Sequence, residues 1–202
     1  MKIKKILALV LSLFMLILQI PISAFAEGET LDLQKDGNWY LINTAEDLYK
    51  FADYVNTTYK ANYSAGTEKS IKGKLTADID LNPGVEFFYD ETTGKIKVEK
   101  EDKTAYIGSG LCGTTRGERS GDEIELKEWN PISGSYVDFD GDGHTVDGVY
   151  VVGRESYPAA GFLGNIWRGD AKNITIGEHS LILNNTALTS SATGGVVGII
   201  KD

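Results

Sequence analysis

The spacing of apolar residues changes near the start of the chain from a strand pattern to a helix pattern. Residues 38–42, NWYLI, form a short apolar run that is typical of a strand. Residues 43–56, NTAEDLYKFADYVN, repeat their apolar positions about every 3.6 residues, which predicts an amphipathic helix. Thr44 is a suitable N-cap, and Asp47 completes a variant capping box. The apolar stripe that we expect this helix to bury comprises Ala45, Leu48, Phe51, Ala52 and Val55.

The next regular pattern follows a polar stretch, residues 56–70, which we interpret as a loop. In residues 73–81, GKLTADIDL, apolar and polar side chains alternate, as in a strand with one buried face. We therefore predict one half-buried strand here, ended by residues 82–84, Asn-Pro-Gly.

Residues 85–127 are rich in charge and glycine, and we interpret them as a surface insertion. Within them, YDETTGKIKV predicts a hairpin whose turn lies near Thr93 and Gly94. Tyr89 and Tyr106 are candidate ligand-contact aromatics, because exposed aromatic rings can stack on sugars or anchor a protein partner. The alternative is that the aromatic residues of this region pack against an end of the fold.

Beyond Trp129 the chain consists of short β-branched runs separated by glycine. GFLGNI at 161–166 recurs loosely as GGVVGI at 194–199, and HTVDGVYV at 144–151 corresponds to KNITIGEHSLI at 172–182, so a unit of roughly 30 residues repeats. Repeated short strands with glycine corners predict an all-β solenoid, in which each strand pairs with the equivalent strand of the next coil. We expect the predicted helix to cover the exposed apolar end of the first coil.

Residues 1–26 have the pattern of a secretory signal peptide. Three lysines precede an apolar run at 6–20, and Ala24 and Ala26 fit the cleavage rule, so we expect the mature chain to begin at Glu27. The alternative is an uncleaved anchor, but the apolar run is shorter than the roughly 20 residues that span a bilayer. We expect no membrane span after the signal peptide is removed.

Charge and cysteine content exclude several classes of protein. The formal net charge is −9, and removal of the signal peptide with its three lysines makes it −12, which disfavours nucleic acid and anionic membranes as partners. A single cysteine, Cys112, excludes an internal disulfide framework. Residues 108–113, GSGLCG, match a dinucleotide-binding fingerprint, but the following residues are turn-rich and supply no helix, so we expect no cofactor.

An ordered series of segments resembles a known group of proteins. The series is NTAEDLYKFADYVN, KLTADIDLN, EWNPIS, FDGDGHTVDGVYV, AGFLGNI, KNITI and TGGVVG. It is similar to exported bacterial proteins of Gram-positive type that carry GLUG-type repeats on a right-handed parallel β-helix. Within this group, similar blocks occur in large surface proteins, including adhesin-like proteins. They also occur in the non-catalytic amino-terminal parts of certain zinc peptidases. The resemblance thus implies a scaffold.

The resemblance and the patterns together give an expected domain organisation. We expect a signal peptide at 1–26, an N-terminal strand and capping helix at 27–73, and β-helix coils at 74–202 with a β-hairpin-like insertion at about 85–127. The sequence departs from the group in its long insertion and in stopping inside a repeat. We therefore expect a β-helix truncated at its C-terminus, with the remainder of a longer chain beyond Asp202.

The segment VDFDGDGHTVDG at 137–148 begins like a calcium-binding EF-hand loop. Asp138, Asp140 and Asp142 occupy its first, third and fifth positions, but the twelfth position, which needs a bidentate acid, is Val149. The sequence predicts instead a corner between strands. In that corner Phe139 would point into the core, Gly141 and Gly143 would have positive φ, and Val146 would restart a strand. The three aspartates remain the candidates for a surface cation contact.

Candidate catalytic groups are few. The two histidines, His144 and His179, lie outside any H-E-x-x-H motif, and the nearby serines, Ser133, Ser135 and Ser180, lack a G-x-S-x-G elbow. Asp78 and Asp80 share one side of a predicted strand, which would suit either a carboxylate pair acting on glycans or a solvated strand face. We expect no catalytic residue.

These observations favour a non-catalytic secreted or cell-surface module with a structural or adhesive role. Its expected partner is a host or cell-wall glycan, or a protein ligand. The alternatives are a carbohydrate-active β-helix enzyme or glycan-binding module that uses acidic and aromatic residues, and a fragment with no function of its own. An enzyme predicts an acidic cleft with a carboxylate pair at catalytic separation, whereas an adhesive module predicts exposed aromatic rings.

Overall fold

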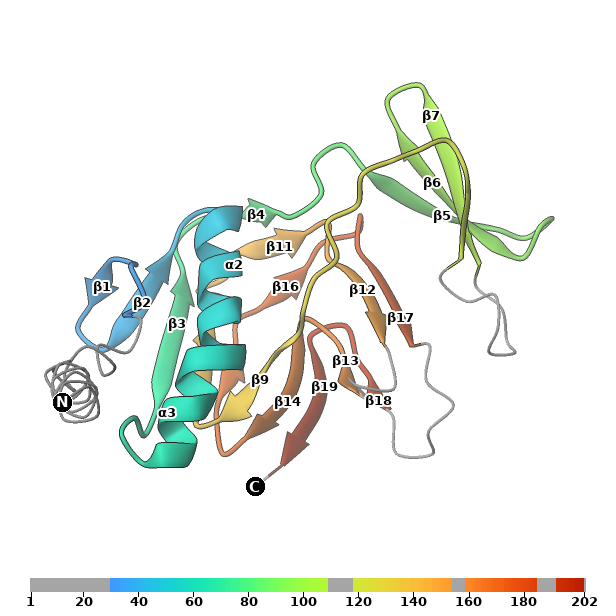
Figure 1. Ribbon diagram of the computed structural model, residues 1–202. Coiled ribbons are helices and arrows are strands. Elements are labelled where there is room, and N and C mark those ends of the chain that lie inside the picture. Colours follow the sequence, from blue (N-terminus) through green and yellow to red (C-terminus); the bar gives the residue numbers. More distant parts are fainter. Residues whose placement is uncertain (1–29, 109–117, 154–158, 185–191, 202) are drawn as a thin grey trace, which may run out of the picture. The chain divides into compact units, whose positions relative to one another are not determined.

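The computed structural model describes residues 30–108, 118–153, 159–184 and 192–201, which are mostly β-structure with several parallel sheets and one helical region (Figure 1). From Leu31 onwards the chain forms one compact unit. The predicted signal peptide and Cys112 lie outside the described residues. In the described part of the chain, no helix combines the length and the apolar character needed to cross a membrane.

The predicted helix begins as expected but ends later. Helix α2 (Ala45–Tyr54) has the predicted capping box: the Asp47 N–H donates to the Thr44 hydroxyl, and the Asp47 side chain accepts from the Thr44 N–H. The helical path then continues through a π-helical turn, η2 (Val55–Tyr59), and helix α3 (Lys60–Ala65). The expected loop at 56–70 is therefore wrong over most of its length. Its polar, partly β-branched sequence has weak helix propensity, which burial of Tyr59 overrides.

Three successive sets of strands pair with one another in parallel (Figure 1). The first set is β3 (Ile71–Leu75), β4 (Ile79–Asp80) and β9 (Ile132–Ser135). The second set is β10 (Val137–Asp140), β11 (Thr145–Asp147), β12 (Tyr150–Gly153), β13 (Ala159–Ala160) and β14 (Leu163–Trp167). The third set is β15 (Ala171–Lys172), β16 (Thr175–Ile176), β17 (Leu181–Asn184), β18 (Ala192–Thr193) and β19 (Val197–Lys201).

Each strand of the second set pairs with the strand at the same place in the third set. The separation of paired residues ranges from 30 positions (Val146 with Ile176) to 34 positions (Leu163 with Val197). The predicted repeat of roughly 30 residues is confirmed as a pairing of strands. The predicted alignment of GFLGNI with GGVVGI is wrong by one residue, because Leu163 pairs with Val197 and not with Val196.

The predicted single strand at 73–81 is instead two strands in different sheets. Strand β3 lies in a five-stranded sheet of order β1-β2-β3-β10-β15, whereas β4 lies in a three-stranded sheet of order β16-β11-β4. The five-stranded sheet also contains the antiparallel pair β1 (Lys35–Asp36) and β2 (Trp39–Ile42), of which β2 is the strand predicted at 38–42. The sequence pattern did not reveal the bend between β3 and β4. Leu75 before the bend and Ile79 after it are both buried, so the apolar positions alternate as they would in one continuous strand.

The insertion is a four-stranded antiparallel sheet and not only a hairpin. Its strands are β5 (Glu86–Asp90), β6 (Lys95–Lys100), β7 (Lys103–Gly108) and β8 (Arg119–Gly121). The predicted turn is confirmed, since the Gly94 N–H donates to the Asp90 carbonyl over 2.8 Å. Val98 and Ile107 are fully buried and belong to one apolar cluster with Tyr150 of β12, so the insertion sheet shares a second core with the strand sets.

The main core is a row of aromatic rings that links the helix to the strand sets. Phe51 of α2 contacts Phe139 of β10, Phe139 contacts Phe162, and Phe162 stacks on Trp129, with ring centroids 6.0, 5.3 and 5.2 Å apart. Phe139 is 1% exposed, which confirms its predicted inward direction. Most of the fully buried residues of this core come from the helical region and the first two strand sets, whereas residues of the third set such as Ala171, Ile176 and Val197 pack against them and are partly buried.

Candidate functional site

The three candidate metal-binding aspartates lie beside lysines of neighbouring strands. Asp138 and Asp140 are cross-strand partners of lysines in the five-stranded sheet, and Asp142 follows in the corner. The ion pairs are Lys72 with Asp138 (2.7 Å), Lys172 with Asp140 (3.3 Å) and Lys74 with Asp142 (2.9 Å). The carboxylates of Asp138 and Asp142 raise the pKa of Lys72 and Lys74 respectively. Each aspartate therefore has a cationic side chain as its neighbour.

Of the three aspartates, Asp140 forms the most hydrogen bonds and ion pairs. Its Oδ1 accepts hydrogen bonds from the Asp142 N–H (2.9 Å) and the Asn173 Nδ2 (3.0 Å). Burial alone would raise its pKa, but these donors and Lys172 lower the pKa below its usual value. Among the residues that the structure describes, no group of three histidine, cysteine or acidic side chains is arranged to hold a metal ion. The arrangement holds the corner together.

The corner itself differs from the prediction at Gly141. Gly143 has the expected positive φ of 85°, and Asp142 has a φ of 51°, so the left-handed pair is Asp142 and Gly143. Gly141 is not left-handed; a Cβ there would lie 2.1 Å from the Asn173 carbonyl oxygen. Its role is close approach of two backbones. Val146 restarts a strand, β11, as predicted.

Histidine, serine and aspartate meet at one place, but their order does not suit nucleophilic catalysis. His179 Nδ1 lies 2.8 Å from Asp147 Oδ2, and the Ser180 hydroxyl donates to Asp147 Oδ1 over 3.4 Å. A catalytic triad needs the serine hydroxyl on the second imidazole nitrogen. Here the Ser180 hydroxyl donates to the Asp147 carboxylate and accepts from the Val149 N–H. The cluster therefore holds a turn of the second strand set to a turn of the third.

A similar contact between an aspartate and a histidine joins the first strand set to the second. Asp78 Oδ1 accepts from the Thr145 N–H over 2.9 Å and lies 3.2 Å from His144 Nδ1. These two contacts, with the backbone donor contributing most, lower the pKa of Asp78. Asp80 instead accepts from the Asn82 N–H two residues on. Asp78 and Asp80 therefore have different partners: Asp78 binds the corner at Thr145 of the second strand set, and Asp80, the last residue of β4, binds the turn that follows it.

The His179–Asp147 contact predicts a pH-dependent stability. The hydrogen bond to Asp147 raises the pKa of His179, so the protonated pair stabilises the fold at low pH and this contribution is lost as pH rises through the raised pKa. We expect the difference in Tm between the parent and H179Q to be present near pH 5.5 and to vanish by about pH 9. Thermal melts across this range would show it. A difference that is constant with pH would contradict the assignment.

The candidate aromatics Tyr89 and Tyr106 lie on opposite faces of the insertion sheet. Tyr89 pairs with Ile96, whereas Tyr106 pairs with the next residue, Lys97, and successive side chains of a strand point to opposite faces. Tyr89 is 62% exposed and shares a face with Phe87, which contacts the buried ring of Tyr150. The two tyrosines therefore do not form a common site.

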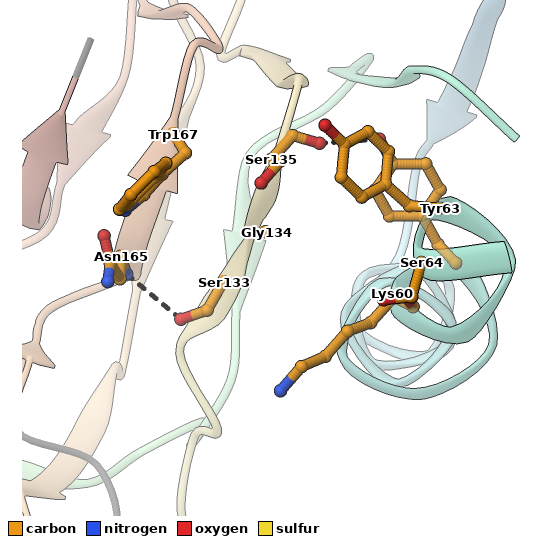
Figure 2. A pocket seen from close by; sticks show the side chains of 9 residues that line it. Lys60, Tyr63, Ser64, Ser133, Gly134, Ser135, Asn165 and Trp167 are labelled. Carbon is orange, nitrogen blue, oxygen red and sulfur yellow. Dashed lines mark hydrogen bonds between the residues drawn. The ribbon is translucent and has the colours of Figure 1, made fainter. Parts of the chain in front are cut away.

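Sequence reasoning missed a pocket of about 400 Å³ (Figure 2). Its floor is strand β9, one wall comes from η2 and α3, and the other wall is strand β14. The lining residues are Tyr59, Lys60, Tyr63, Ser64, Ser133, Gly134, Ser135, Asn165 and Trp167. The one available signal was a large aromatic, Trp167, at the end of a buried strand, where it is 45% exposed.

Hydrogen bonds hold the walls of this pocket to its floor. The Tyr59 hydroxyl donates to the Ser135 carbonyl over 2.6 Å, and burial of Tyr59 raises its pKa to about 12. On the other side, the Asn165 N–H donates to the Ser133 hydroxyl over 3.0 Å (Figure 2). In Figure 2, Trp167 and Tyr63 stand on opposite sides of β9. The pocket is thus a preformed slot with an aromatic ring on each side.

No protein-family model, curated protein or solved structure matches this chain.

Proposed function

We propose that this protein is an exported, non-catalytic surface module with a structural or adhesive role, built on a right-handed parallel β-helix. One observation carries the β-helix: five successive strands, β10 to β14, pair in parallel and in the same order with the next five, β15 to β19. That pairing is what stacked coils of a solenoid produce. Right-handed crossovers are nearly universal between parallel strands, which favours the right-handed form.

Recurring backbone corners support the same proposal. Tyr136 and Arg168 both have positive φ, 56° and 52°, and lie 32 positions apart. Asp142 and Asn173, with φ of 51° and 53°, lie 31 positions apart. Positive φ is uncommon for residues other than glycine, particularly for bulky ones. Its recurrence at matching places in successive strand sets is expected of equivalent corners in stacked coils.

The helix acts as a cap on the first strand set. Strand β9 pairs with β14 on one side, which leaves its other edge to be satisfied. The Asn56 side chain covers that edge by donating to the Pro131 carbonyl (3.2 Å) and accepting from the Ser133 N–H (2.9 Å). The Tyr59 hydroxyl also binds this edge, by donating to the Ser135 carbonyl. Such protection of an exposed strand edge is what a solenoid requires at its end.

Support for a non-catalytic role comes from the partners of the polar groups. The aspartates of the corner pair with lysines, and Asp78 and Asp147 hold turns. Support for export comes from the signal-peptide pattern of residues 1–26 and from the resemblance to GLUG-type surface proteins. Because these ionisable groups form structural contacts with one another and with the backbone, the contacts favour a scaffold function.

Expression of the full chain in a Gram-positive host tests this proposal. We expect the protein in the medium or cell-wall fraction, with mass spectrometry giving Glu27 as its first residue. Incubation with cell-wall and host polysaccharides should release no new reducing ends. Retention of an intact Met1 form inside the cell would overturn export, and release of reducing sugar would overturn the non-catalytic role in favour of a carbohydrate-active enzyme.

A further inference from the structure

We propose that the pocket between η2–α3, β9 and β14 is a saccharide-binding site. This inference rests on the proposed adhesive role and names the chemical class of its ligand. The volume of about 400 Å³ lies within the range of small-molecule sites. The three segments that form it are far apart in sequence, but hydrogen bonds fix two of them on the third, so binding requires little ordering of the protein.

The walls suit the apolar faces of a sugar ring. Trp167 is 45% exposed although it ends a strand whose other residues are mostly buried, and Tyr63 faces the slot from the helix (Figure 2). An exposed indole with a second ring across a slot offers two flat apolar surfaces. Pyranose rings present C–H faces that pack on such surfaces, while their hydroxyls point outward around the ring.

The polar groups of the pocket suit those hydroxyls. Asn165 Oδ1 is buried and has no hydrogen-bond partner within the described part of the chain. A buried acceptor that lacks a donor is destabilising, and a rotation of the Asn165 side chain towards a ligand hydroxyl in the slot would satisfy it. Ser133 lies beside it, with its hydroxyl accepting from the Asn165 N–H, and Ser135 lies further along the floor (Figure 2). An acceptor next to hydroxyl groups matches a ligand with many O–H donors and acceptors better than a purely apolar one.

The charges of the pocket favour binding over cleavage. The lining contains one charged side chain, Lys60, and no carboxylate. Glycoside hydrolysis uses a pair of carboxylates, which these residues do not supply. Among the described residues, Lys60 forms no ion pair, so its ammonium can contact a polar or acidic substituent of a sugar. With a formal net charge of −9, the chain does not favour nucleic acid, the other large class of ligand that stacks on aromatic rings.

Calorimetric titration of the protein tests the site. The probes are soluble hexasaccharides of three kinds: β-1,4-glucose, β-1,4-N-acetylglucosamine and α-1,4-galacturonate. We expect at least one to bind, with W167A weakening the affinity at least ~10-fold and N165A about 5- to 10-fold. Y89A and Y106A, on the insertion sheet, serve as matched controls and should leave the affinity within about twofold.

A second readout does not depend on variants. Addition of the bound hexasaccharide should shift NMR signals of β9, β14 and α3 and leave those of β5 to β8 unchanged. Failure of all three probes to bind, or shifts confined to the insertion sheet, would overturn the saccharide site while leaving the exported scaffold intact. Chromatography of the probes after incubation distinguishes the two proposals: shortened saccharides would overturn the non-catalytic role, whatever the site of binding.

Discussion

Replacing Gly141 with alanine should destabilise the fold by about 3 kcal/mol. The added Cβ would lie 2.1 Å from the Asn173 carbonyl oxygen and 2.8 Å from its carbonyl carbon. Both atoms belong to the backbone of the third strand set, and the Gly141 N–H also bonds to the Lys172 carbonyl over 2.9 Å. Because the clash is with backbone, relief requires the second and third strand sets to separate at this corner. Urea denaturation would measure the loss.

Gly195 provides the matched control for this change. A Cβ at Gly195 meets no atom within 4 Å, and its backbone is not left-handed. We therefore expect G195A to change the free energy of unfolding by no more than about 0.5 kcal/mol. Equal losses in G141A and G195A would show that the strand sets do not approach as closely at the corner as this structure places them.

Replacing Trp129 with alanine should cost about 3–5 kcal/mol, the largest effect that we expect from one side chain. Trp129 is 1% exposed; its ring stacks on Phe162 at 5.2 Å and contacts Tyr49 at 5.4 Å. Its Nε1 donates to the Phe162 carbonyl over 2.7 Å, so the substitution leaves both a cavity and an unpaired acceptor. The loss should appear as a lower midpoint in urea at an unchanged slope.

Two other variants, W129F and W167A, test how far the loss depends on the hydrogen bond and on the burial of the ring. W129F keeps most of the ring volume and removes the N–H, so it should lose about 1–2 kcal/mol, less than W129A. W167A removes the same kind of side chain from the pocket wall, where it is 45% exposed, and should cost less than about 1 kcal/mol. If W129A were no more harmful than W167A, the row of aromatic rings would not be the centre of the core.

The candidate site shows where sequence reasoning succeeds and where it stops. The pattern at 137–148 correctly predicted a corner with Phe139 inward and a strand restarting at Val146, because those features depend on neighbouring residues. It did not predict that Lys72 and Lys172 would flank the aspartates, since they come from different strand sets. The pocket was missed for the same reason: its residues come from three distant segments.

The sequence by itself determined the local elements. The start of α2 follows from its capping box, the hairpin turn at Gly94 follows from the turn sequence, and the repeat in the second half follows from recurring apolar and glycine positions. Each signal lies within a few residues, where backbone propensity and side-chain periodicity act directly. They are sufficient to predict a mostly β-structure with one amphipathic helix.

Only the tertiary structure decided the registers and the boundaries. It extended the helix to Ala65 by burying Tyr59, divided 73–81 between two sheets, and fixed Leu163 opposite Val197. A one-residue shift in register reverses the face of every side chain in a strand, so packing of the whole core selects the register. The close approach at Gly141 likewise depends on a carbonyl 32 residues away, which no local pattern can specify.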